Sequence, residues 1–184
     1  MRLVIQSIEG EFRRYKHLAE ASFAQLSNQQ LTQAGGVADN SVATVAWHIG
    51  GNLRSRFTDF LDADGEKPWR DRESEFQRRS VTHEELLAFW EPGWLALFST
   101  LAPLTDDDLN RTVKIRNQPL PVVDALHRSI AHTSYHVGQI VFIAKALLGE
   151  NWKYLTIPPG KSAEYNQNPT HERPFRASDA GAKA

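Results

Sequence analysis

Two histidines in the C-terminal half of the chain have the spacing of a metal-binding pair. His132 and His136 are four residues apart in the stretch AHTSYHVGQIVFIAK. On a helix, both side chains project from one face with Cβ atoms roughly 6 Å apart, so two imidazoles can bind one metal ion. The spacing alone is a weak signal, because such a pair often arises by chance in a chain with 7 histidines.

The predicted helix over residues 121–149 places this pair on the side that faces the interior. At about 100° per residue, the two histidines share a stripe with Ala125, Ser129, Gln139 and Ile143. Burying polar groups without partners costs on the order of a few kcal/mol each, whereas a shared metal ion would use both rings. Four further histidines lie off this stripe or in other segments and are excluded from the site: His17, His83, His127 and His171.

His48 is the third candidate ligand, in the middle of the predicted helix that contains WHIGGNLRSRF. Gly50 and Gly51 follow it directly, and two glycines inside a helix cost about 1 kcal/mol each relative to alanine. A broken local rule beside a candidate ligand often marks a functional site. The glycines make room for a ligand or only permit tight helix packing, and a lone histidine on a helix, such as His48, is more often a hydrogen-bonded core residue than a ligand.

Four amphipathic helices must position these side chains. Apolar residues recur every three to four positions in four segments, which predicts helices over residues 3–26, 41–61, 82–101 and 121–149. The connection RTVKIRNQPLP before the last helix is predicted to be irregular or strand-like, with a turn near Asn117. The pattern indicates an all-α fold, a four-helix bundle.

Side chains that can cap helices support two of these beginnings. Asp39, Asn40 or Ser41 offers an N-cap for the second helix. Thr82 followed by Glu85 has the form of a capping box for the third.

Length and composition indicate one domain and exclude several classes of protein. We predict a bundle domain over residues 1–166, with its last segment wrapping the bundle, and a flexible tail over residues 167–184. A net charge of -1 leaves no field that would attract nucleic acid or an anionic membrane. No stretch resembles a secretory signal or a membrane span, so we expect a cytoplasmic protein. The absence of cysteine excludes disulfides and thiolate ligands.

Three other features have both a functional and a structural interpretation. Arginines around the charged loop after the second helix, Arg54, Arg56, Arg70 and Arg72, could form an anion-binding rim. They alternate with acidic residues, however, which favours a solvated face with ordinary ion pairs. Tryptophans could line a pocket, although core packing is favoured for most of Trp47, Trp69, Trp90 and Trp94. The last helix is also apolar on its opposite side, which predicts a homodimer through Ile130, Val137 and Val141.

These motifs together resemble the DinB/YfiT-like superfamily. The resemblance rests on VAWHIGGNLRSRFTDFL, the loop DGEKPWRDRESEF, the LTDDDL turn, AHTSYHVGQIVFIAK and GENWKYLTIPPGKSAEYN, and it covers roughly residues 3–166. It implies a bundle, often dimeric, in which His48, His132 and His136 hold nickel, zinc or iron. Relatives include thiol-dependent S-transferases and an isomerase, and others are regarded as hydrolases. Related sulfoxide synthases carry an acid where this chain has Gly138, so the resemblance disfavours that chemistry.

The leading functional hypothesis is a metal-dependent transferase for a small-molecule substrate. Three neutral imidazoles leave at least one coordination position open, and the metal can lower the pKa of a bound low-molecular-weight thiol. Asn52, Arg56 and Gln139 are the candidate orienting groups. Metal-dependent hydrolysis and a dimeric metal-binding or sensing module without turnover are the alternatives, because three-histidine ligation serves each of them.

Overall fold

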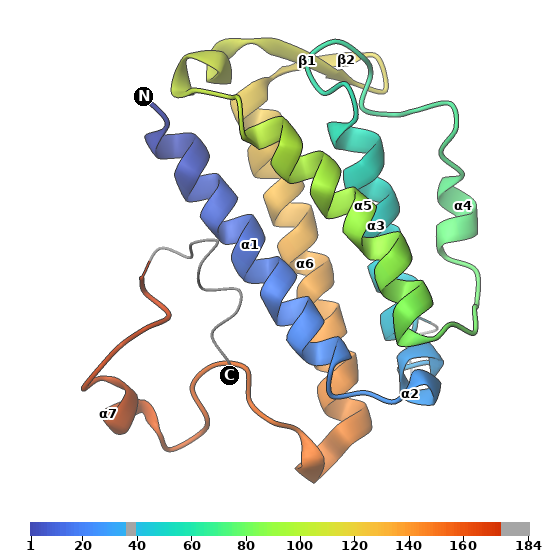
Figure 1. Ribbon diagram of the computed structural model, residues 1–184, viewed down its shortest axis with the longest axis vertical. Coiled ribbons are helices and arrows are strands. Elements are labelled where there is room, and N and C mark those ends of the chain that lie inside the picture. Colours follow the sequence, from blue (N-terminus) through green and yellow to red (C-terminus); the bar gives the residue numbers. More distant parts are fainter. Residues whose placement is uncertain (36–39, 174–184) are drawn as a thin grey trace.

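Four long helices that lie alongside one another dominate the computed structural model, which describes residues 1–35 and 40–173 (Figure 1). They are α1 (Leu3–Phe23), α3 (Val42–Phe57), α5 (His83–Leu101) and α6 (Val122–Leu148). Between and after them are the short elements α2 (Asn28–Thr32), α4 (Arg72–Glu75), η1 (Asp106–Asn110), η2 (Gly149–Asn151) and α7 (Ser162–Tyr165). The predicted all-α bundle is confirmed.

The beginnings of two helices follow the predicted capping chemistry. The Ser41 hydroxyl accepts a hydrogen bond from the backbone N–H of Thr44 at 3.1 Å, and Thr82 and Glu85 form the complete capping box. Asp39, another of the three candidates for the cap of α3, lies outside the described residues. The second helix ends four residues earlier than predicted, because the chain is extended at Thr58 and then left-handed at Asp59, where φ is 48°.

A close approach of two helix backbones fixes the position of α3 in the bundle. Helices α3 and α5 pack together, and a Cβ atom added at Gly93 would lie 2.4 Å from the carbonyl oxygen of Gly50. No side chain fits at that point, so one role of Gly50 is tight helix packing. Trp90 and Trp94 are fully buried beside it in the hydrophobic core, as the core interpretation of these two tryptophans predicts.

The predicted strand-like connection is a short antiparallel hairpin that covers one end of the bundle (Figure 1). Strands β1 (Thr112–Ile115) and β2 (Gln118–Pro121) are joined by a two-residue turn with positive φ at Arg116 and Asn117. The carboxylate of Asp64 accepts hydrogen bonds from the backbone N–H groups of both turn residues, at 2.8 and 2.6 Å. The loop after α3 is therefore attached to the hairpin.

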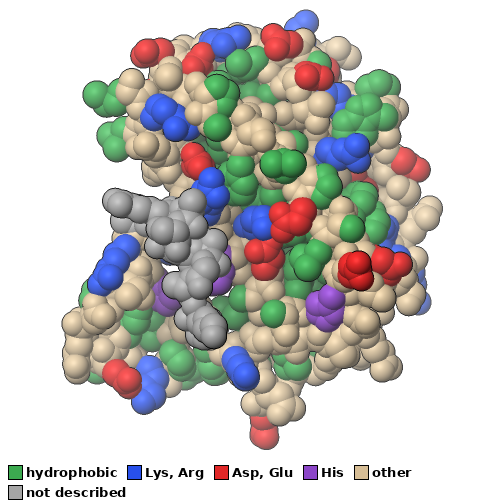
Figure 2. Space-filling view, viewed as in Figure 1, with side chains coloured by type: hydrophobic (Ala, Val, Ile, Leu, Met, Phe, Trp, Pro, Cys, Tyr) green, Lys and Arg blue, Asp and Glu red, His purple; other side chains and the backbone are tan. Residues whose placement is uncertain are grey.

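The apolar side of α6 that suggested a homodimer lies within the bundle. Val137 is 1% exposed, and Ile130 and Val141 are partly buried against the core. The chain itself covers this side, and the homodimer stays a prediction. On the face seen in Figure 2, acidic and basic side chains are mixed, with hydrophobic side chains between them. Within residues 1–35 and 40–173, no helix has the length and apolar character needed to cross a membrane.

Candidate metal site

The three predicted ligands meet between helices α3 and α6. Their ligand nitrogens lie within 4.8 Å of one another, and the Nε2 atoms of His48 and His132 are 3.2 Å apart. The ring centres of His132 and His136 are 4.5 Å apart, as expected for neighbours one helical turn apart. His48 is 3% exposed, and the other two rings are half-buried. The structure thus brings together a histidine triad that could bind a metal ion.

Acceptor groups behind two of the rings orient their free nitrogens toward one another. His48 donates from Nδ1 to Oε2 of Glu75 at 2.8 Å, and His136 donates from Nδ1 to Oε1 of Gln139 at 3.0 Å. A carboxylate and an amide oxygen only accept, so each ring keeps its Nε2 lone pair. Fixing the tautomer of a histidine through its other nitrogen is typical of metal ligands.

The electrostatic environment favours the neutral imidazoles that a metal needs. Burial, with the neighbouring rings of His136 and His48, lowers the pKa of His132 to about 3. Burial also lowers the pKa of His136, although its hydrogen bond with Gln139 acts in the opposite direction. Both rings are therefore neutral near pH 7, and neutral histidine is the form that binds a metal ion.

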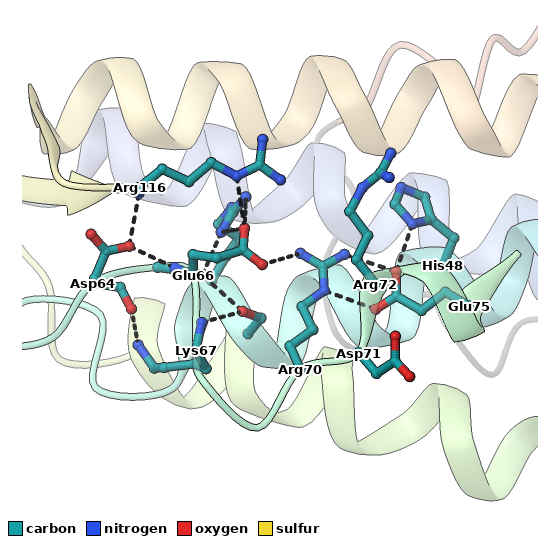
Figure 3. Close-up of polar contacts among 12 residues, drawn as sticks. His48, Asp64, Glu66, Lys67, Arg70, Asp71, Arg72, Glu75 and Arg116 are labelled. Carbon is teal, nitrogen blue, oxygen red and sulfur yellow. Dashed lines mark hydrogen bonds and ion pairs between the residues drawn. The ribbon is translucent and has the colours of Figure 1, made fainter.

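Glu75 is a neighbour of the histidine triad that the sequence analysis missed, and Arg70, which it named only as part of a possible anion-binding rim, holds the Glu75 carboxylate. Both lie in the charged loop after α3, and Arg70 donates from Nε and Nη2 to the two carboxylate oxygens of Glu75 at 2.8 Å each (Figure 3). Burial raises the pKa of the Glu75 carboxyl, but hydrogen bonds from Arg70 and His48 outweigh it and bring the pKa below its ordinary value. Glu75 is therefore a buried, ionised acceptor for the ring of His48.

The second glycine after His48 makes the space for this carboxylate. A Cβ atom added at Gly51 would lie 2.3 Å from Oε1 of Glu75. The Gly-Gly pair was the available signal for a buried neighbour of His48, although it did not say which residue that would be. Gly50 serves helix packing and Gly51 serves the site, so both interpretations of the pair apply, one to each residue.

A pocket of about 250 Å³ opens beside the triad. His48 and His132 line it, together with two of the predicted orienting residues, Asn52 and Arg56. Arg56 donates to the carbonyl oxygen of Gly65 and to Glu66, so it also holds the loop in place. Gln139, the third predicted orienting residue, contacts His136 instead and is not among the described residues that line the pocket.

The predicted arginine rim is divided between the pocket and the surface. Arg56, Arg70 and Arg72 line the pocket, while Arg54 lies over the ring of Trp69, with 5.1 Å from its guanidinium carbon to the ring centre. The ion pairs expected from the alternating charges are present, but the side chain of Arg70 is only 2% exposed. This part of the loop is a pocket wall as well as a charged surface.

The geometry fits a divalent metal ion with an open coordination position. In a tetrahedral site, two nitrogens that bind the same zinc ion at about 2.1 Å are roughly 3.4 Å apart. The Nε2 atoms of His48 and His132 already have a similar separation, and the ligand nitrogen of His136 lies within 4.8 Å of both. Three imidazoles beside a pocket, two of them with an acceptor that orients the ring, resemble catalytic rather than structural zinc sites.

Comparisons with known proteins show the family and support the fold. A family model described as "Protein of unknown function (DUF1572)" matches residues 2–161. The chain belongs to this family. All three histidines and Glu75 lie in the part of the chain that the family model matches, so the site is within the DUF1572 region.

One solved structure shares the arrangement of helices. It is described as the crystal structure of a conserved protein of locus from Enterococcus faecalis, with 17% identity and a TM-score of 0.60 over 81% of this chain and 99% of that chain. At this identity, the likeness shows the fold alone. A comparison with curated proteins finds no match.

Proposed function

We propose that the chain binds one divalent metal ion through His48, His132 and His136 and uses it to transfer a low-molecular-weight thiol to an electrophile. The observation that carries the metal site is the convergence of three rings with two hydrogen-bond acceptors that fix their nitrogens. The resemblance of the sequence to the DinB/YfiT-like superfamily supports the same ligands.

The choice of a thiol over water rests on the lack of a general base. Glu75 is ionised, but Arg70 and His48 already occupy its oxygens, and no carboxylate is among the described residues that line the pocket. Metal-bound water also ionises near neutral pH, but hydrolysis of an ester or amide still needs a proton for the leaving group, which a positioned acid or base usually supplies. A thiol has a pKa near 8.5, so a metal can make it a thiolate at neutral pH without one.

The proposed reaction balances without a redox partner. The thiol loses its proton to solvent, its sulfur forms a bond to the electrophilic carbon, and the leaving group departs with the electrons of the broken bond. The bound metal supplies a lower thiol pKa. Asn52 and Arg56, in the pocket wall, are the proposed orienting groups for the electrophile.

The first test is elemental analysis of the full chain purified without an affinity tag. We expect about one metal ion per chain, lost in His132→Ala and retained in His127→Ala, whose ring is exposed on the same helix. Wild-type protein that stays metal-free after incubation with zinc, nickel or iron would contradict the site.

The second test follows thiol consumption with a panel of alkyl halides and epoxides, and compares it with ester and amide hydrolysis. We expect metal-dependent loss of thiol in the wild type and in His127→Ala, but not in His132→Ala. Hydrolysis without thiol consumption, or no turnover by metal-loaded protein, would overturn the transferase proposal while leaving the metal site intact.

A further inference from the structure

The pocket beside the histidine triad has a strongly basic wall. Six of its lining residues are cationic, and they come from α3, the loop after it, the hairpin and α6: Arg56, Arg70, Arg72, Lys114, Arg116 and Arg128. No described lining residue is acidic. The whole chain has a net charge of -1, so this concentration of positive charge is local.

Part of this charge is already neutralised by two carboxylates. Glu66 pairs with Arg56 and Arg116 at 3.3 and 3.0 Å, and Glu75 pairs with Arg70 (Figure 3). These pairs hold the loop and the hairpin together. They account for three of the six cations, and they leave one positive charge in excess.

The remaining cations are available to a ligand. The side chains of Lys114 on β1 and Arg128 on α6 make no hydrogen bond or ion pair in the described part of the chain. The guanidinium of Arg72 pairs with the exposed Glu73 and lies over the ring of Phe76, with 5.0 Å from its central carbon to the ring centre. Arg128 is four residues before His132 on α6, so the two side chains are neighbours on one helix face. A free guanidinium therefore lies next to the proposed metal ligand.

Two buried polar groups in the same wall also lack a hydrogen-bond partner. Ser129 is 8% exposed, and its hydroxyl makes no hydrogen bond in the described part of the chain. The Nη1 atom of Arg70 is also buried without a hydrogen bond, and its nearest acidic atom is Oε1 of Glu66, an ion-pair partner at 3.8 Å. Buried polar atoms without partners are uncommon in folded proteins, because each costs free energy. A ligand oxygen in the pocket would give each of them one.

Another part of the wall is apolar. The aromatic rings of Phe57 and Phe60 and the side chains of Val113 and Ile115 line the pocket next to the cations. A ligand that fills this space would place a hydrocarbon body on these side chains and a negative group against the basic wall.

We propose that this pocket binds a small molecule with an apolar body and one anionic group, a carboxylate or a phosphate, which Arg128, Lys114 and Ser129 hold beside the histidine triad. In the proposed thiol transfer, this molecule is the electrophile or the thiol, and that part of the proposal rests on the proposed function. The binding step itself does not require the metal.

The test compares two probes of the same shape that differ in charge. Calorimetric titration of the full chain with 4-phenylbutyrate and with its neutral amide, before and after removal of metal by a chelator, measures the preference for an anion. We expect the carboxylate to bind roughly tenfold more tightly than the amide, since hydrogen bonds to charged groups are about twice as strong as neutral ones. Phosphate is the second anionic probe, and it should compete with the carboxylate.

Variants locate the anion within the pocket. We expect Arg128→Gln and Ser129→Ala each to weaken carboxylate binding roughly fivefold, without changing binding of the amide or the metal content. Arg111→Gln is the matched control, because Arg111 is exposed, pairs with Asp108 and does not line the pocket.

Several results would overturn the proposal. These are equal affinity for the two probes, no binding of either anion to the wild type, or an Arg111→Gln effect as large as that of Arg128→Gln. Protein that binds the carboxylate but takes up no metal would keep the anion site and remove the proposed function. Protein that takes up metal but does not prefer the anion would remove the anion site and leave the proposed function in place.

Discussion

The Nδ1 atom of His48 lies 2.8 Å from Oε2 of Glu75, so a loop carboxylate fixes the ring of a candidate metal ligand on helix α3. Arg70 holds the same carboxylate through two further hydrogen bonds. Replacing a residue that hydrogen-bonds a metal ligand commonly changes metal affinity roughly 10- to 100-fold.

Glu75→Gln should therefore weaken zinc binding about 10- to 100-fold. The amide has the same size, but it lacks the charge that Arg70 and His48 stabilise. Competition with a chromophoric zinc chelator measures the affinity. Glu73→Gln, an exposed change in the same short helix, is the control and should leave the affinity unchanged. Equal zinc affinities of Glu75→Gln and the wild type would show that the carboxylate does not support the ligand.

Gln139→Leu should weaken zinc binding less, by roughly two- to tenfold, because it removes one neutral hydrogen bond from His136. The same chelator assay gives the comparison, and circular dichroism checks that the helix content is kept. The ionised Glu75 should support zinc binding more than the neutral Gln139, so a larger loss of affinity in Gln139→Leu than in Glu75→Gln would contradict this prediction.

Two glycines in helices should respond in opposite ways to alanine. Gly93→Ala places a Cβ atom against the backbone of Gly50, so we expect a loss of about 1–3 kcal/mol in the free energy of unfolding. Gly138 has no neighbouring atom within 4 Å of an added Cβ, and Gly138→Ala should add about 0.5–1 kcal/mol. Urea unfolding of both variants measures the difference, and a stable Gly93→Ala protein would contradict the close contact of α3 and α5.

Asp64 should contribute to stability in a pH-dependent way. Burial raises the pKa of its carboxyl, but hydrogen bonds from the backbone N–H groups of Glu66, Asn117 and Arg116 outweigh it, so the pKa lies below the ordinary value of 3.8. A carboxyl with a lower pKa in the folded state stabilises the protein above the unfolded value, and this contribution disappears as the pH falls below 3.8.

Asp64→Asn tests this contribution. The variant should be less stable than the wild type at pH 7, and the difference should shrink as the pH falls below 3.8, as measured by urea unfolding of metal-free protein across that range. Asp107→Asn, a change in the 3-10 helix η1, is the control for the loss of one negative charge. A stability difference that does not change with pH would mean that Asp64 does not act through its charge.

The parts of this site that lie on long helices could be predicted from the sequence. Apolar periodicity predicted α1, α3, α5 and α6, and the helical register then placed His132 and His136 on the inner stripe. The capping residues Ser41 and Thr82 were equally local signals, since each acts on a backbone group three residues away.

The parts that depend on the path of the loop after α3 could not be predicted. Glu75 reaches His48 across 27 positions, and nothing in the local sequence specifies that contact. The alternating charges of the loop suggested a solvated face, yet the fold turns Arg70 inward. Arg128 on α6 and Lys114 on β1 line the same pocket as the loop residue Arg70, an arrangement that the tertiary fold specifies.

The separation of the ligands along the chain has a consequence for how the protein unfolds. His48 and His132 are 84 positions apart, and a chain without cysteine has no covalent cross-link between its halves. An ion bound to both would be released when the chain unfolds, so its binding free energy would add to the free energy of unfolding. The histidines that would hold the metal would then also link α3 to α6.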